Sequence, residues 1–210
     1  MADRMQLAAD ERSDLADFLE SLTPEQWERP SLCEAWTIQK VVAHIISYEE
    51  LSYPGVAAAF VRGGFRPGRI NEQRLAAYRE HTPGQLIEIL RSHLRPHGLT
   101  AGFAGGIGLS DCLIHHQDIR RPLGLPREVP HERLLEALQI ALRAPVIPAK
   151  RNADGLRLVA TDLDWQHGDG IEVTGPAEAL LMTLAGRTDA LDELEGPGQP
   201  ALRERVAAAG

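Results

Sequence analysis

Four side chains that can bind a metal or move protons lie close together in the segment DCLIHHQDIRRPLG, residues 111–124. They are Asp111, His115, His116 and Asp118. Residues three or four positions apart share one face of a helix, so we expect Asp111, His115 and Asp118 on a common face. The helical pitch directs His116 about 100° away from that face. A carboxylate and an imidazole at this spacing can share one divalent metal, as ligand pairs do in helical bundles.

A further ligand must come from a facing helix, and His44 is the candidate. It lies in TIQKVVAHIISYEELSY, on the flank of a face that carries several apolar residues. Two imidazole nitrogens and one carboxylate oxygen leave an open position for water or substrate, which is the pattern of a catalytic Zn²⁺ site. The alternative is a solvated helix face on which Asp111 and His115 only bond to each other, with His44 at the edge of the core.

The neighbouring polar residues have expected roles around such a site. Asp118 can hydrogen-bond a ligand from behind, and Arg120 and Arg121 can neutralise it or bind an anionic substrate. Cys33 is a candidate nucleophile, but it lies in a loop and has no base adjacent in the sequence. Cys112 lies on the apolar side of the same helix as Asp111 and is expected to be packed.

The elements that must position these residues are expected to be helices in the first part of the chain. Both helices and strands are expected after them. Apolar residues that recur at helical spacing predict helices. Further along the chain, apolar and polar residues alternate, which predicts strands. The expected helices span 5–22, 37–53, part of 55–68, 70–80, 83–94, a segment from about Ser110 to Pro122, 131–142 and 176–186. Strands are expected at 156–165 and 171–174, as a hairpin with the turn QHGDG.

This order predicts a mainly α protein, in which a helical bundle is followed by a small α/β module. We place the bundle with its metal site at residues 1–150 and the C-terminal module at 151–210. The formal net charge of −8 disfavours a nucleic-acid partner. No apolar run is long enough to span a bilayer and the first residues are charged, so we expect a cytoplasmic protein without a membrane partner.

Three segments resemble one known family, in family order. PSLCEAWTIQKVVAHI, DCLIHHQDIRRPLG and LVATDLDWQHGDGIEVTGPAEALLMTLAGR are similar to signatures of the mycothiol-dependent maleylpyruvate isomerase family, within the DinB-like metalloprotein superfamily. The resemblance implies a DinB-like four-helix bundle with metal ligands at His44, Asp111 and His115. This chain has Asp111 where the family usually has Glu, a side chain shorter by one methylene. The family's C-terminal module contributes a catalytic Arg, and Arg187 is the candidate here.

The resemblance also implies the chemistry. We expect a divalent metal, in the first place Zn²⁺, although Ni²⁺ or Fe²⁺ also suit this donor set. Mycothiol or a similar low-molecular-weight thiol would be the co-substrate, and a small electrophile the second substrate. The expected activity is thiol transfer, or isomerisation if the thiol leaves again. Two alternatives are a metal-dependent hydrolase and a non-enzymatic metal- or small-molecule-binding DinB-like protein. A monomer and a homodimer are both compatible with the sequence.

Overall fold

The computed structural model describes residues 3–33, 36–49 and 67–208. The chain divides into two compact units, residues 1–126 and 127–210. Among the described residues, no helix is both long enough and apolar enough to cross a membrane.

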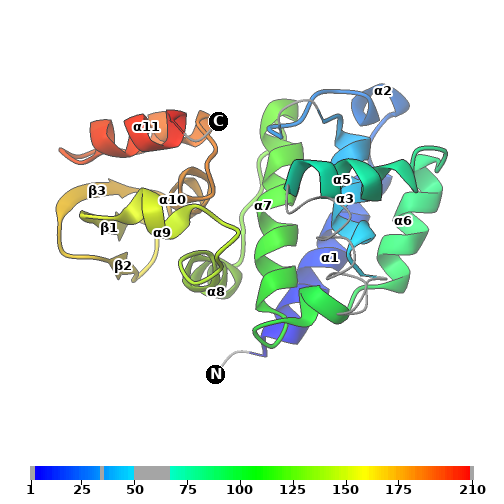
Figure 1. Ribbon diagram of the computed structural model, residues 1–210, viewed down its shortest axis with the longest axis horizontal. Helices are drawn as coiled ribbons and strands as arrows, with labels where there is room; N and C mark the ends of the chain where they lie inside the picture. Colours follow the sequence, from blue (N-terminus) through cyan, green and yellow to red (C-terminus); the bar gives the residue numbers. More distant parts are fainter. Residues whose placement is uncertain (1–2, 34–35, 50–66, 209–210) are drawn as a thin grey trace. The chain divides into compact units, whose positions relative to one another are not determined.

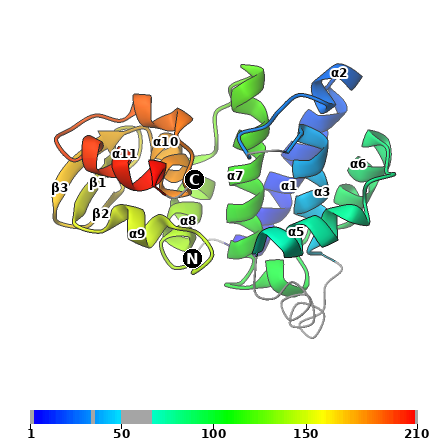
Figure 2. The same ribbon diagram turned by 45° about the horizontal axis from the view of Figure 1, so that its top comes forward.

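The first unit is a four-helix bundle with short additional helices (Figures 1 and 2). Its elements are α1 (Arg4–Glu20), α2 (Pro24–Trp27), α3 (Ile38–Ser47), α5 (Pro67–Ala76), α6 (Pro83–Ser92), the 3-10 helix η1 (Gly98–Ala101) and α7 (Gly106–Leu123). Helix α1 packs against α7 and α6, and α3 packs against the same two helices. These four contacts close a ring, which confirms the expected bundle. Helix α5 packs on the outside of α3.

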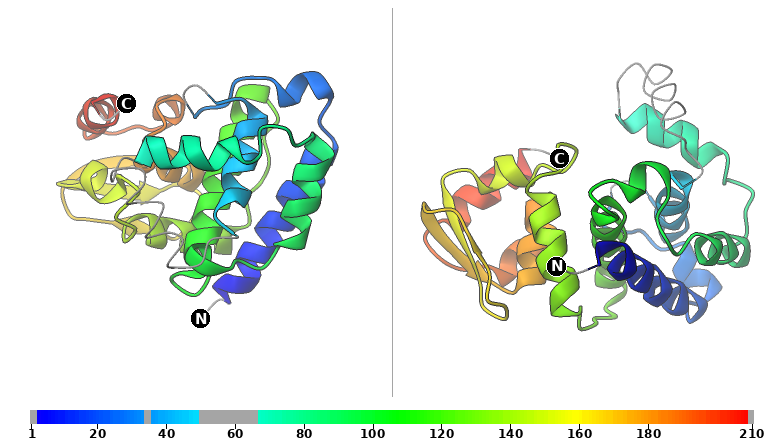
Figure 3. Two further views of the ribbon diagram at one scale, coloured as in Figure 1. Left: turned by 45° about the vertical axis from the view of Figure 1, so that its right-hand side comes forward. Right: turned by 90° about the horizontal axis from the view of Figure 1, so that it is seen from below.

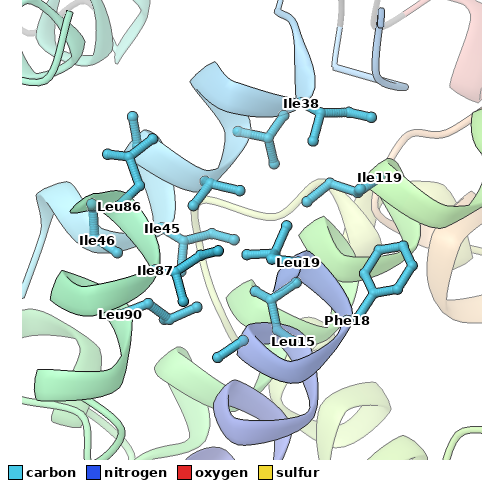
Figure 4. Close-up of a cluster of buried hydrophobic side chains, with 14 of the residues drawn as sticks. Leu15, Phe18, Leu19, Ile38, Ile45, Ile46, Leu86, Ile87, Leu90 and Ile119 are labelled. Atoms are coloured by element: carbon cyan, nitrogen blue, oxygen red, sulfur yellow. The ribbon is translucent and has the colours of Figure 1, made fainter. Parts of the chain in front are cut away.

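All four bundle helices contribute to one hydrophobic core (Figure 4). The apolar residues recur at helical spacing on each helix, so folding brings their faces together and removes them from water. The buried side chains include Leu15, Leu19, Ile38, Ile45, Leu86, Leu90, Cys112 and Ile119. Because α3 and α7 are neighbours in this core, residues on the flanks of their apolar faces come close to one another.

Helix α7 is longer at both ends than the sequence predicts. It begins at Gly106, before Ser110, and it continues through Pro122 to Leu123. Proline lacks an N–H and normally ends a helix, but in the last turn it removes only one intrahelical bond. The helix ends instead at Gly124, whose φ of 66° is a left-handed conformation that glycine adopts without strain. The prediction that Pro122 ends the helix was therefore wrong.

Helix α3 ends earlier than predicted, at Ser47. Tyr48 and Glu49 form a turn, and residues 50–53 of the expected helix 37–53, together with most of the short helix expected within 55–68, lie outside the described residues. Thr37 occupies the N-cap position of α3, as predicted. Helix α6 begins with a capping box, in which Thr82 Oγ1 accepts from the N–H of Gln85 and Gln85 Oε1 accepts from the N–H of Thr82.

The second unit is a small α/β module. Its elements are α8 (His131–Ala141), α9 (Ala149–Ala153), β1 (Leu156–Ala160), β2 (Gln166–His167), β3 (Ile171–Gly175), α10 (Ala177–Leu184), the 3-10 helix η2 (Asp189–Glu193) and α11 (Gln199–Ala207). The strand order is β2-β1-β3. Helix α10 contacts β1 and also α8, and Figure 3 shows the strands as one layer of this unit.

The two longer strands are parallel, which corrects the expected hairpin. Residues Leu156 and Ile171 are opposite each other in β1 and β3, whereas β2 pairs with β1 in the antiparallel sense on its other edge. The predicted turn QHGDG contains β2 and the crossing to β3. At Gly170 a Cβ would overlap the carbonyl of Gly155, so the chain can make this close crossing only with glycine.

The boundary between the two units lies at Pro126, earlier than the expected position of 150. The reason is that α8 packs its buried face against α10 of the second unit. Helical periodicity identified α8 correctly, but periodicity does not say which partner covers the apolar face. The helix was therefore assigned by sequence to the bundle that precedes it.

Candidate metal centre

The residues predicted to bind a metal come together between α3 and α7. Asp111 and His115 are one turn apart on α7, and His115 Nε2 lies 3.6 Å from Asp111 Oδ1. His44 on α3 points its Nε2 at the same oxygen, at 3.9 Å. The imidazole rings of His44 and His115 are nearly perpendicular, with centroids 4.9 Å apart. Two imidazole nitrogens and one carboxylate oxygen therefore converge on one point.

The group is partly shielded from water. The side chains of His44 and His115 are 12 % and 11 % exposed, whereas Asp111 is 29 % exposed, so solvent reaches the group at the carboxylate. Two aromatic rings lie next to His44, with Trp36 at 5.0 Å and Tyr48 at 5.4 Å between centroids. An apolar wall of this kind strengthens electrostatic interactions within the group, because it lowers the local dielectric constant.

Asp118 supports His115 from behind. It is fully buried one turn further along α7, and the Nδ1–H of His115 donates to its Oδ2 at 2.8 Å. With the proton fixed on Nδ1, the lone pair of Nε2 can face a metal. A carboxylate behind a ligating histidine is the usual arrangement in protein metal sites. The structure thus places Asp118 where the sequence predicted a supporting group.

The electrostatics of the metal-free group favour a positive charge on His115. Burial alone lowers the pKa of His115, but the charge of Asp111 and the hydrogen bonds with Asp118 and Cys33 together raise it to about 10. The pKa of Tyr48 is also raised, first by burial and then by the charge of Asp111, while Arg74 acts in the opposite direction. Asp111 therefore sets the potential on both sides of the group.

The geometry fits a tetrahedral divalent ion. Bonds of about 2.0–2.2 Å at tetrahedral angles put neighbouring ligand atoms roughly 3.4 Å apart. The separations of 3.6 Å and 3.9 Å from Asp111 Oδ1 to the two Nε2 atoms are within about half an ångström of that value. His44, Asp111 and His115 also form a group whose possible ligand atoms all lie within 4.8 Å of one another. Two imidazoles and one carboxylate suit Zn²⁺ and other divalent transition metals.

The histidine next to His115 has a different environment. His116 is fully buried against α1, where its Nδ1 lies 3.0 Å from Glu11 Oε1. Its Nε2 accepts from the Nε–H of Arg120, whose guanidinium also stacks on the Phe18 ring at 3.7 Å. His116 is thus directed away from the candidate metal position, as the helical pitch predicted. Arg120 thus joins α7 to α1.

The remaining predicted site residue is Arg187. It lies in the second unit, just after α10, where its Nη1 donates to the carbonyl of Ala185 at 2.7 Å. Its catalytic role stays a prediction.

Sequence reasoning considered Cys33 as a nucleophile but did not predict its place beside His115 and Asp118. Its Sγ lies 3.1 Å from Asp118 Oδ2 and 3.6 Å from His115 Nδ1. The only sequence signal was its place in the motif PSLCEAW, and 82 residues separate it from His115. No local spacing rule can join residues so far apart in the chain.

Comparisons with known proteins agree with the observed fold. Residues 8–95 match the family model of the mycothiol maleylpyruvate isomerase N-terminal domain, a stretch that includes His44 but ends before α7. A crystal structure of a histidine-to-alanine mutant of the mycothiol-dependent maleylpyruvate isomerase superimposes with a TM-score of 0.58 at 16 % identity, covering 93 % of this chain and 92 % of that chain. A second crystal structure of that isomerase gives a TM-score of 0.54 at 15 % identity, with the same coverage. The comparison with curated proteins found no significant match.

Proposed function

Because the N-terminal part of this chain belongs to the mycothiol maleylpyruvate isomerase N-terminal domain family, we propose that the protein is a metal-dependent isomerase or transferase that uses mycothiol or a similar thiol. The observation that carries the proposal is the convergence of His44, Asp111 and His115 on one point. The fold shared with the isomerase structures supports it, since both comparisons cover nearly the whole chain.

The three converging residues would hold the metal, and Asp111 supplies the only negative charge among them. One carboxylate and two neutral imidazoles leave a divalent ion with a net charge of about +1. A bound Zn²⁺ would supply a centre that deprotonates a coordinated thiol, which makes the thiolate the nucleophile. The partial exposure of Asp111 leaves a side from which such a thiol can approach.

The residues around the ligands orient the reaction and limit the access of water. Asp118 holds the Nδ1 proton of His115, so that Nε2 stays available as a ligand. Trp36 and Tyr48 pack next to His44 and restrict the movement of its ring. The thiolate would add to a carbon of an activated double bond in the electrophile. The electron pair of the double bond would move to the activating carbonyl as an enolate. Rotation about the resulting single bond and departure of the thiolate would re-form the double bond as the other isomer, whereas protonation of the enolate carbon from water would keep the new C–S bond and complete a transfer.

Two measurements test this function. The purified protein should contain about one divalent metal per chain, and turnover of maleylpyruvate should require both that metal and mycothiol. His44→Ala should abolish metal binding and turnover. The matched control is His131→Ala, which removes an exposed histidine at the start of α8 and should leave both unchanged.

The result also separates the proposal from its alternatives. Metal binding without thiol-dependent turnover of maleylpyruvate or of other small electrophiles would favour a binding protein. Thiol-independent hydrolysis by the metal-loaded protein would favour a hydrolase. A protein that binds no divalent metal would refute the metal-dependent reading.

A further inference from the structure

The loop that carries Cys33 is fixed to α7 by a hydrogen bond that a proline makes possible. In an α-helix the carbonyl of Asp118 would accept from the N–H of residue 122, but Pro122 has none. The backbone N–H of Leu32 donates to this carbonyl instead, at 3.0 Å. The loop is closed at its base by an antiparallel bridge between Pro30 and Thr37.

Local hydrogen bonds then hold the position of Cys33 within the loop. Its N–H donates to Ser31 Oγ at 3.1 Å, and its carbonyl accepts from the N–H of Trp36 at 3.0 Å. Ser31 Oγ also donates to the carbonyl of Trp36 at 2.9 Å. The backbone on both sides of Cys33 is therefore anchored, and its side chain is held against α7.

The thiol of Cys33 and the ring of His115 share one acceptor. The S–H of Cys33 and the Nδ1–H of His115 both donate to Asp118 Oδ2, at 3.1 Å and 2.8 Å. Asp118 has no exposed surface, so these donors offset part of the cost of burying its charge. The distance of 3.6 Å between Sγ and Nδ1 follows from the shared acceptor.

These distances describe hydrogen bonds rather than a second metal group. Ligand atoms on one tetrahedral ion would be separated by roughly 3.3–3.7 Å, given bonds of about 2.0–2.3 Å. Two of the three separations among Cys33, His115 and Asp118 are shorter than that. By contrast, the separations of 3.6 Å and 3.9 Å from Asp111 Oδ1 to the two Nε2 atoms are not shorter than that range. His115 thus has a metal-facing nitrogen on one side and a hydrogen-bonded nitrogen on the other.

We propose that Cys33 is a positioning residue of the metal centre, which acts through Asp118 on the orientation and tautomer of His115. The inference rests on the proposed function, because it assigns a role in holding the metal. A second donor on Oδ2 keeps the buried carboxylate in the plane that His115 needs. Without the Cys33 donor, Oδ2 keeps one of these two donors, so the carboxylate is held less tightly in that plane and Nε2 of His115 is aimed less accurately at the metal.

The first experiment measures Zn²⁺ affinity by competition with a chelator. Removing a partner behind a metal ligand typically costs about 10–100-fold in affinity. We expect Asp118→Asn near the upper end of that range and Cys33→Ala near the lower end. Cys33→Ser keeps an O–H donor and should recover part of the loss. Because Cys33 acts through Asp118, the double variant should bind no more weakly than Asp118→Asn alone.

The second experiment uses the metal-free protein, so it does not depend on metal binding. In the parent, the Nδ1–H proton of His115 should give an NMR signal that is protected from exchange with water. Cys33→Ala should weaken that protection, and Cys33→Ser should restore much of it. If the parent bound no metal, the proposed function would fall, whereas an unchanged signal in Cys33→Ala would overturn the positioning role.

The matched control is Cys112→Ala, which removes the other thiol of the chain from a fully buried position on α7. It should lower the free energy of unfolding and leave Zn²⁺ affinity unchanged. Two further results would overturn the inference. One is a Zn²⁺ affinity in Cys33→Ala equal to that of the parent. The other is a thiolate-to-metal charge-transfer band in the Co²⁺-loaded parent that disappears in Cys33→Ser, since it would make Cys33 a ligand.

Discussion

Metal binding at this centre should release a proton, because His115 is positively charged in the metal-free protein. Its pKa is lowered by burial but raised to about 10 by Asp111, Asp118 and Cys33 together. The Nδ1 proton is held by Asp118, so the proton that leaves is the one on Nε2. At pH 7.5 only about one molecule in 300 has this nitrogen free, which costs about 3 kcal/mol of apparent binding free energy.

The consequence is a pH dependence of metal affinity. Between pH 6.5 and 8.5, the apparent association constant for Zn²⁺ should rise about tenfold per pH unit. Calorimetric titrations in two buffers with different ionisation enthalpies should count about one proton released per metal at pH 7.5. An affinity independent of pH, together with a proton count near zero, would refute the argument that Asp111 and Asp118 hold His115 in its charged form.

The same group links pH to the stability of the metal-free protein. Since the pKa of His115 is raised above its ordinary value of about 6.5, its charged form stabilises the fold. That contribution is complete below about pH 6.5 and is lost as the pH rises through about 10. In the presence of a chelator, the free energy of unfolding should therefore fall over this range, and His115→Gln should remove the slope.

Three other substitutions have expected outcomes. Asp111→Asn should greatly weaken metal binding, measured as metal stoichiometry, and leave the far-ultraviolet helix signal unchanged; an unchanged metal content would remove Asp111 from the centre. Glu49→Gln breaks a buried ion pair with Arg12, so chemical denaturation should show that the free energy of unfolding falls by about 3–5 kcal/mol. A decrease below about 1 kcal/mol would mean that water screens the pair. Gly105→Ala would place a Cβ 2.8 Å from the Cα of Met5 at a φ of 92°, so the thermal midpoint should fall by several degrees, whereas an unchanged midpoint would show that α1 can move aside.

The periodicity of α7 was enough to predict that Asp111, His115 and Asp118 share one face, which forms one side of the candidate metal centre. Asp111, His115 and Asp118 are separated by four and three residues, and a regular helix leaves little freedom in how such residues align. His44 was a weaker prediction, because its side chain lies on the flank of α3 and its partner helix is not encoded locally. Its place on the flank of an apolar helix made it the candidate, the resemblance of PSLCEAWTIQKVVAHI to the isomerase family supported that choice, and the structure brings His44 to Asp111.

Tertiary packing decided what the sequence could not predict. Helix α8 has a clear apolar face, but only the structure shows that α10 covers it. The strands at 156–160 and 171–175 were recognised from their alternation, yet their parallel direction depends on β2 taking the other edge of β1. In both cases the local pattern specifies an element and a buried face, while the partner of that face is chosen by the rest of the chain.

Pro122 shows how a residue with no reactive group contributes to the site. Sequence rules predict that it ends the helix, because its ring removes an N–H and crowds the carbonyl four residues earlier. In the structure the helix continues to Leu123, and the missing N–H leaves the carbonyl of Asp118 available to Leu32. That one bond joins the loop before α3 to the turn of α7 whose side chain supports His115. The proline therefore contributes to the candidate metal centre through the backbone, because it leaves the carbonyl of Asp118 to accept from the N–H of Leu32.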